Sequence, residues 1–436
     1  MKKLFLLIVT VVTLAAFNGC QKLDIPKFGG HSSITKSISA SVATDWYNLQ
    51  VRILLERNSA LNGNYFGYIG IGLYESVRYA IPNSVSLSTK LYQMPDMPAK
   101  ENTNDYDWQV SANAAMAAMV RAFYTGLTPE NMASIDSLED AYNQKLIPGI
   151  NSANFTRSQS FGRSIAGAVH NWFLTDDLNP SGAGYVAPMF PGAWVPTPPA
   201  FVNPPVLPYV GVARTFLAAN LTGVAPAPMH YSEEINSGFY KMVKHVYDVS
   251  LTLTPEQKNI ALFWIDQGNG TGLTPHGHDM AIVTQAIEQR QFNLGTAAEA
   301  YAKAGIAERD ATIECFRSKY KYTLVRPVTY IQKLINSAWL PFIVTPPHPE
   351  YPAAHAYVTG SVMQAATVVL GDRVAVTDHS YDFRGWTPRS FSTLFAAGEE
   401  AGISRLYGGI HYLPSINMGL SLGKDLGNRV GKIKLH

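Results

Sequence analysis

Apolar residues recur at helical spacing along most of this 436-residue chain. Spacings of three and four residues place apolar side chains on one face of a helix. The predicted helices cover 46–55, 69–79, 109–124, 129–146, 156–174, 232–249, 254–266, 279–290, 297–320, 354–370, 389–406 and 416–430. Alternating patterns typical of strands are scarce, so the sequence predicts an all-α fold, a large bundle of about a dozen helices.

A segment rich in proline and glycine interrupts this pattern between residues 176 and 212. Each proline fixes φ and removes a backbone donor, so the segment cannot continue a helix. It also contains Trp194, Phe201 and Tyr209, whereas a disordered linker usually has few large aromatic residues. We therefore expect a long loop that packs over the helices.

The N-terminus has the pattern of an export signal. Met1-Lys2-Lys3 is basic, Leu4 to Ala16 is apolar, and Gly19 precedes Cys20. The apolar run is too short to span a bilayer as a mature helix. The pattern resembles a bacterial lipoprotein signal over residues 1–19, with lipid on Cys20; plain secretion is the alternative. We expect an exported protein in the periplasm or at the cell surface, anchored to a membrane through this lipid.

Composition narrows the classes of partner. Lys and Arg total 34 and Asp and Glu total 32, so the net charge is only +2. Nucleic-acid-binding domains usually carry a clear basic excess, so nucleic acid is not an expected partner. With Cys20 linked to lipid, Cys315 is the only other cysteine and has no disulfide partner in the chain. We interpret Cys315 as a small buried hydrophobic residue.

Three short clusters in the last third of the chain carry the candidate chemistry. They contain Lys319 with Arg326, then His355, then Arg405 with His411. Three cations and two histidines are the residue types needed to hold a tetrahedral oxyanion and to transfer protons to it. Each cluster alone also fits a plain structural role, such as a solvated basic face or a packed histidine. Together they indicate a site for phosphate or vanadate.

The spacing within the clusters suggests how the site is built. Lys319 and Arg326 are seven residues apart, so one continuous helix, ended by Pro327, would project both from one face. His355 follows a proline-rich approach at a helix start, where the free backbone N–H of Ala354 favours an anion. The pair Gly408-Gly409 allows a bend that aims the two residues of the third cluster at one centre.

The clusters Lys319-x6-Arg326-Pro327, Pro352-Ala353-Ala354-His355 and Ser404-Arg405-x5-His411 resemble the motifs of a known superfamily. It comprises the vanadium-dependent haloperoxidases and the type 2 phosphatidic acid phosphatases (PAP2). The run 319–322 is more similar to the haloperoxidase branch, and the resemblance extends upstream through 74–78, 194–199 and 263–264. It implies two packed helix bundles, which follow a tether at 20–40: an N-terminal helical region over 41–250 and a catalytic helical region over 251–436.

The resemblance also implies a role for each matching residue. The groups that would neutralise and bind the oxyanion are Lys319, Arg326, Arg405 and the backbone N–H of Ala354. His355 would be the acid–base residue, with Asp266 as the carboxylate that orients it. His411 would be the protein ligand of a vanadate cofactor, or, in a phosphatase without metal, the nucleophile that forms a phosphohistidine. His348 would influence halide handling, as in bromide-using members.

Two residues depart from the motifs. Ala353 replaces the motif serine, which removes a hydrogen bond to the anion worth about 1–3 kcal/mol. Ser415 stands where the phosphatase pattern has the aspartate that orients the nucleophilic histidine, so we expect that carboxylate to be missing. His276 and His278 flank Gly277 as a metal pair would, but their setting without cysteine argues against a zinc site.

We predict an enzyme that acts on small molecules, a vanadium-dependent haloperoxidase that oxidises bromide or iodide with hydrogen peroxide. One alternative is an acid phosphatase of the same superfamily that acts through a phosphohistidine. The other is a degenerate member that binds an oxyanion without turnover. A homodimer is compatible with each of the three.

Overall fold

The computed structural model describes residues 37–55, 63–266 and 272–436. The predicted signal peptide, Cys20 and most of the tether lie outside these residues, so export and lipid anchoring stay predictions. Thirteen α-helices are described: α2 (Ser41–Leu55), α3 (Gly63–Val77), α4 (Trp108–Phe123), α5 (Pro129–Leu146), α6 (Ser152–Phe173), α7 (Gly238–Leu251), α8 (Pro255–Phe263), α9 (Pro275–Gln289), α10 (Leu294–Tyr322), α11 (Pro327–Leu334), α12 (Ala354–Leu370), α13 (Leu394–Tyr407) and α14 (Leu413–Gly431). The prediction of an all-α fold of this size is confirmed.

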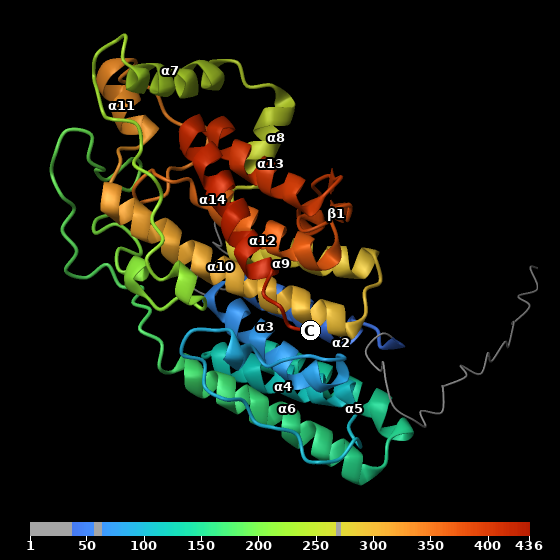
Figure 1. Ribbon diagram of the computed structural model, residues 1–436. Coiled ribbons are helices and arrows are strands. Elements are labelled where there is room, and N and C mark those ends of the chain that lie inside the picture. The colour runs from blue at the N-terminus through green and yellow to red at the C-terminus, as the bar shows by residue number, and fades with distance from the viewer. Residues whose placement is uncertain (1–36, 56–62, 267–271) are drawn as a thin grey trace, which may run out of the picture. The chain divides into compact units, whose positions relative to one another are not determined.

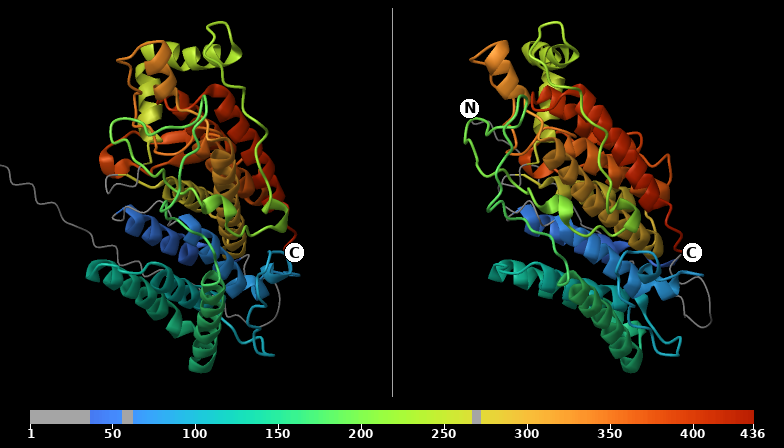
Figure 2. Two further views of the ribbon diagram at one scale, coloured as in Figure 1. Left: turned by 90° about the vertical axis from the view of Figure 1, so that its left-hand side faces the viewer. Right: turned by 60° about the vertical axis from the view of Figure 1, so that its left-hand side comes forward.

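The long helix α10 is the centre of the packing (Figure 1). One side of α10 packs on α3, and behind α3 the helices α4, α5 and α6 pack on one another (Figure 2). Its other side packs on α12, which also contacts α13 and α14. Because α12 carries the candidate histidine of the second cluster, this arrangement places the candidate site beside the central helix.

Several boundaries differ from those predicted. The helix predicted from Ser232 begins at Gly238, because the Ser237 side chain caps it by accepting from the backbone N–H of Tyr240. The helix predicted from Arg389 begins at Leu394, because 389–391 form a strand instead. Strand β2 (Arg389–Phe391) pairs antiparallel with β1 (Val376–Asp378). Strands of three residues are too short to show a pattern of alternation.

The proline-rich loop at 176–212 packs on the C-terminal end of α10. The Trp194 backbone N–H donates to Thr323 O at 2.6 Å, and that of Val325 donates to Gly192 O at 2.9 Å. Trp194 is buried. The loop therefore covers the end of the helix that carries the first cluster. No helix among the described residues is both long and apolar enough to cross a membrane.

Close contact between α3 and α10 requires glycine at the crossing. A Cβ atom on Gly305 would lie 2.6 Å from Phe66 O and 2.7 Å from Gly67 Cα, closer than real Cβ contacts. Gly305→Ala should therefore lower the free energy of unfolding by about 1–3 kcal/mol, as overpacking of a core does. Denaturant titration measures this loss. Gly167→Ala in α6 is the control, because its Cβ would meet nothing within 4 Å; an equal loss in both variants would contradict the packing argument.

Candidate active site

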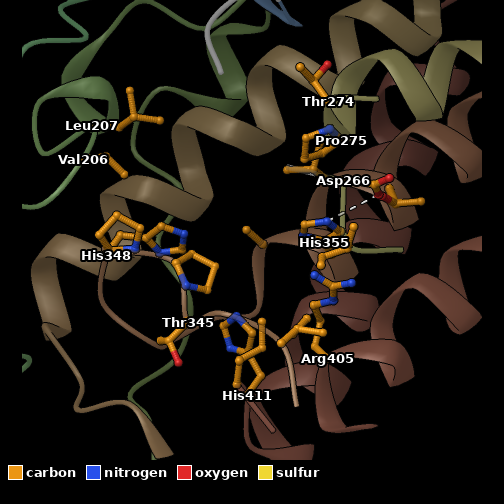
Figure 3. A pocket seen from close by; sticks show the side chains of 18 of the residues that line it. Val206, Leu207, Asp266, Thr274, Pro275, Thr345, His348, His355, Arg405 and His411 are labelled. Atoms are coloured by element: carbon orange, nitrogen blue, oxygen red, sulfur yellow. Dashed lines mark ion pairs between the residues drawn. The ribbon is translucent and has the colours of Figure 1, made fainter. Parts of the chain in front are cut away.

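The second and third clusters line one cavity of about 430 Å³, and the first cluster lies behind its wall. Its lining includes Asp266, His348, His355, Arg405 and His411. Figure 3 shows His348 on one side of the cavity and His355 with Arg405 on the other. His411 lies between them, in the turn from α13 to α14. Residues up to 145 positions apart in the chain are thus brought to one place.

The prediction of one continuous helix through Lys319 and Arg326 is wrong. Helix α10 ends at Tyr322, and Thr323 adopts a left-handed conformation with φ of 44°. Arg326 is extended and precedes α11, with Pro327 as its first residue. Proline at the first helical position starts a helix without loss of a hydrogen bond, so Pro327 begins a new helix rather than ending the old one.

Lys319 and Arg326 nevertheless donate to the backbone of the same segment, residues 348–350. The Lys319 Nζ donates to the carbonyl oxygens of Pro349 and Glu350, both at 2.9 Å. The Arg326 Nε donates to His348 O at 2.8 Å. Both side chains are buried and do not line the cavity surface themselves. They fix the approach to α12 and place two positive charges directly behind it.

Burial changes the protonation of these cations. Burial lowers the pKa of Lys319 to about 7, and the neighbouring Arg326 adds to the effect. Burial also lowers the pKa of Arg326 and that of Arg405 to about 10 each. Desolvation and repulsion between like charges both disfavour the charged forms. A bound anion would reverse this effect, so the site is electrostatically suited to an anion.

His411 has a defined tautomer. Its Nε2 lies 3.0 Å from Arg326 Nη1, and because a guanidinium only donates, Nε2 must accept. Its Nδ1 therefore carries the proton and donates to Glu350 Oε1 at 2.8 Å. Burial holds the pKa of His411 well below its usual range. The histidine is thus neutral, with a lone pair on Nε2 suited to a ligand role.

The carboxylate expected to be missing is present, but from another segment. Glu350 stands 61 residues before His411 and takes the orienting role that Ser415 cannot. The same Oε1 also accepts from the backbone N–H of Tyr412 at 3.0 Å. Burial raises the pKa of Glu350 to about 7, although Lys319 and Arg326 oppose the rise. No spacing in the sequence pointed to Glu350, because its pairing with His411 depends on tertiary packing.

Asp266 lies near His355 but bonds other residues more closely. The distance from Asp266 Oδ2 to His355 Nε2 is 3.5 Å, longer than a good hydrogen bond (Figure 3). Asp266 Oδ1 accepts from the Tyr381 hydroxyl at 2.7 Å and lies 2.9 Å from His278 Nδ1. His278 Nε2 in turn lies 2.8 Å from Asp378 Oδ2. The sequence patterns did not predict this buried network of Asp266, His278 and Asp378.

The charges of these three residues follow from their contacts. Although burial opposes it, His278 holds the pKa of Asp266 below its usual range. Conversely, the two carboxylates raise the pKa of His278 well above its usual range, against the effect of burial. Burial and the nearby Arg405 lower the pKa of His355 to about 4. His355 is therefore a neutral base beside a fixed carboxylate.

The remaining predicted residues have clear places. The Arg405 guanidinium donates to Trp264 O and, through Nε at 2.9 Å, to Ser404 Oγ. Ala354 is the first residue of α12 and lines the cavity. His276 and His278 do not form a pair, because His276 lies beside Glu308 instead. Cys315 is buried away from the cavity lining, and burial raises its pKa to about 11.

The donors present fit a tetrahedral oxyanion. Lys319, Arg326 and Arg405 are fixed cations around the cavity, and the first turn of α12 opens onto it. Among the described residues, nothing accepts or donates a hydrogen bond at the buried Nε2 of His355. A buried polar atom without a partner at a cavity wall is suited to a ligand oxygen.

Comparison with known proteins supports the same class. Residues 299–434 match the sequence model of the VCPO second helical-bundle domain. The structure is similar to that of a bacterial vanadium-dependent iodoperoxidase, with a TM-score of 0.80, 29% identity and coverage of 92% of this chain and 97% of that one. It is also similar in fold to a bacterial vanadium-dependent chloroperoxidase, with a TM-score of 0.63, 14% identity and coverage of 92% and 94%. No curated protein sequence matches the chain.

These findings confirm the resemblance predicted from the motifs. Residues 299–434 carry the VCPO second helical-bundle domain, and the fold is that of the bacterial vanadium-dependent haloperoxidases.

Proposed function

We propose that this enzyme holds vanadate at His411 Nε2 and oxidises bromide or iodide with hydrogen peroxide. The observation that carries the proposal is the neutral His411, whose Nδ1–H donates to Glu350 Oε1 and whose Nε2 faces Arg326. Bound vanadate would supply a Lewis acid that polarises peroxide. The similarity to an iodoperoxidase at 29% identity supports the choice of a heavier halide.

In this proposal the other residues of the site bind the anion and transfer protons. Arg405 lines the cavity and would bind the anion, while Lys319 and Arg326 behind the wall would balance its charge; the anion in turn favours the protonated form of Lys319. The backbone N–H of Ala354 offers a donor at the start of α12. His355 would move a proton to or from the anion, and Asp266, 3.5 Å from its Nε2, lies beside the ring.

His348 is our proposed halide-site residue. It lines the cavity opposite His355 (Figure 3). Its Nδ1 lies 3.1 Å from Arg326 Nη2 and 3.1 Å from Pro349 O, so both contacts hold the ring on the Nδ1 side. Burial, with Lys319 and Arg326, holds its pKa well below the usual range. A neutral ring beside a cation can contact a large polarisable anion without a strong charge of its own.

The test is halide oxidation by the purified mature protein with iodide, bromide and peroxide, with and without orthovanadate. We expect turnover that depends on vanadate, together with vanadate binding seen by vanadium NMR. A phosphoester assay runs in parallel. Bound vanadate without halide oxidation, or phosphoester hydrolysis that vanadate inhibits, would contradict the proposal.

A further inference from the structure

A second polar cluster adjoins the cavity on the side of α9. His276, in the first turn of this helix, lines the cavity. Behind it lie two buried carboxylates, Asp279 on the same helix and Glu308 on α10. The Nδ1 of His276 is 2.7 Å from Glu308 Oε1. The Thr359 hydroxyl of α12, another lining residue, lies on the Asp279 side and lowers its pKa.

These carboxylates lack the partners that buried charges need. Among the described residues, neither oxygen of Asp279 makes a hydrogen bond of good geometry, and the Thr359 hydroxyl is the polar group beside them. Glu308 has no lysine or arginine partner there, and His276 is its one ion-pair partner. Two adjacent unpaired carboxylates are too costly to bury in the charged form, so such pairs retain protons. The cluster has no role in the fold that its contacts explain.

The surrounding titratable groups support this protonated state. Burial and the nearby Glu308 raise the pKa of Asp279 well above its usual range, and Asp266 adds to the rise. Burial raises the pKa of Glu308, with His276 opposing. Tyr47 on α2 faces Glu308 and is itself protonated, because burial raises its pKa well above the usual range. His278 opposes the rise in the pKa of Asp279.

We propose that Asp279 and Glu308 store a proton that His276 delivers to the cavity during turnover. The inference rests on the proposed haloperoxidase function, in which halide, hydrogen peroxide and one proton give hypohalous acid and water. The O–O bond breaks, the halide loses two electrons as it bonds to one oxygen, and the other oxygen leaves as water with the delivered proton. His276 takes a proton from Glu308 at Nδ1 and releases one from Nε2. Solvent in the cavity then protonates His276 at Nε2, and the ring returns its Nδ1 proton to Glu308, which restores both groups.

His355 alone does not supply this proton at neutral pH. Burial and Arg405 lower the pKa of His355 to about 4, whereas burial raises the pKa of both Asp279 and Glu308, so the carboxylate pair holds a proton more readily than His355 does. His276 and His355 line the same cavity, so a proton released by His276 enters the space where peroxide would be cleaved. The cluster therefore fits a donor that is separate from the oxyanion site.

The catalytic test compares pH profiles of the vanadate-loaded enzyme. In His276→Gln and Glu308→Gln, kcat should fall about 100-fold above neutral pH, the lower end of the effect of a positioned general acid. In acid, where the solvent supplies protons, kcat should approach that of the wild type. Glu314→Gln is the matched control, since Glu314 is buried on the same helix but bonds Tyr357 and does not line the cavity. Profiles of His276→Gln and Glu308→Gln that coincide with the wild type would overturn the proposal.

An infrared measurement tests proton storage without catalysis. The wild type at neutral pH should show the carbonyl stretch of a protonated carboxylic acid, which is lost in Glu308→Gln or Asp279→Asn. Absence of a band that depends on these residues would overturn this inference even in an active enzyme. If the band is present but the protein oxidises no halide, the proposed function fails and the delivery role fails with it.

Stability gives a second check with a definite sign. A carboxyl whose pKa is raised by folding binds more protons in the folded state, so stability falls as pH rises from the unfolded pKa to the folded pKa. Asp279→Asn removes this loss and should raise the melting temperature above the wild-type value at neutral and alkaline pH, with no gain in acid. The exposed Asp140→Asn serves as control. Equal melting temperatures of the wild type and Asp279→Asn from acid to alkaline pH would contradict a protonated Asp279.

Discussion

Replacing His411 by alanine is expected to abolish vanadate-dependent halide oxidation and vanadate binding together. The proposed ligand atom is His411 Nε2, whose lone pair faces Arg326 Nη1 while Glu350 holds the other ring nitrogen, so an anion bound there would take the place of the guanidinium contact. Among the described residues, no group of three or more metal-binding side chains offers a substitute. We expect kcat/KM to fall by more than about a thousandfold, as when one member of a catalytic unit is removed.

The measurement must separate loss of the ligand from loss of the fold. His411→Ala leaves Glu350 buried without its imidazole partner, although the backbone N–H of Tyr412 still donates to it. Circular dichroism and the melting temperature would report any loss of structure. His379→Ala is the control, because His379 is exposed and contacts Asp382 at the surface. Retained vanadate binding in a folded His411→Ala protein would show that another residue holds the anion.

The sequence predicted the elements that depend on local patterns. The helix predicted at 129–146 matches α5, since Thr128 caps it and Pro129 begins it. The helix predicted at 354–370 matches α12 for the same kind of reason, since proline precedes it and Gly371 ends it. Such signals act over a few residues and are visible without knowledge of the fold.

The end of α10 shows where local patterns fail. Lys319 and Arg326 have the spacing of one helix face, yet the chain leaves the helix at Thr323. A left-handed conformation is rare for threonine, so nothing in its chemistry announces the break. The contact that accompanies it is long-range, because Thr323 O accepts from the backbone of Trp194 in the proline-rich loop. The motif identified both cations correctly as neighbours but gave the wrong geometry for them.

The polar network around the cavity was the least predictable part. The pairs Glu350–His411 and His278–Asp378 are 61 and 100 residues apart, and both are made by packing of separate helices and loops. A motif shared by a superfamily reports the atoms that contact a ligand. It does not report which segment supplies the carboxylate behind them, and here Glu350 replaces the side chain expected at position 415.

Glu350→Gln should weaken vanadate binding by about 10- to 100-fold, the usual effect of removing a partner behind a metal ligand. The amide oxygen can still accept from His411 Nδ1, but the negative charge that favours this tautomer is lost. The charge also balances Lys319 and Arg326 on the same side of the cavity. We therefore expect the affinity for vanadate to fall more than kcat does in the fully loaded enzyme.

The experiment is a vanadate titration followed by kinetics at saturating vanadate. Glu314→Gln again controls for the loss of a buried carboxylate, because it bonds Tyr357 and does not contact His411. Vanadate affinity equal to the wild type in Glu350→Gln would mean that Arg326 alone fixes the His411 ring. A fall in vanadate affinity with kcat preserved would show that Glu350 positions His411 as the vanadate ligand. The carboxylate that orients His411 would then lie in the segment before α12, and not at position 415.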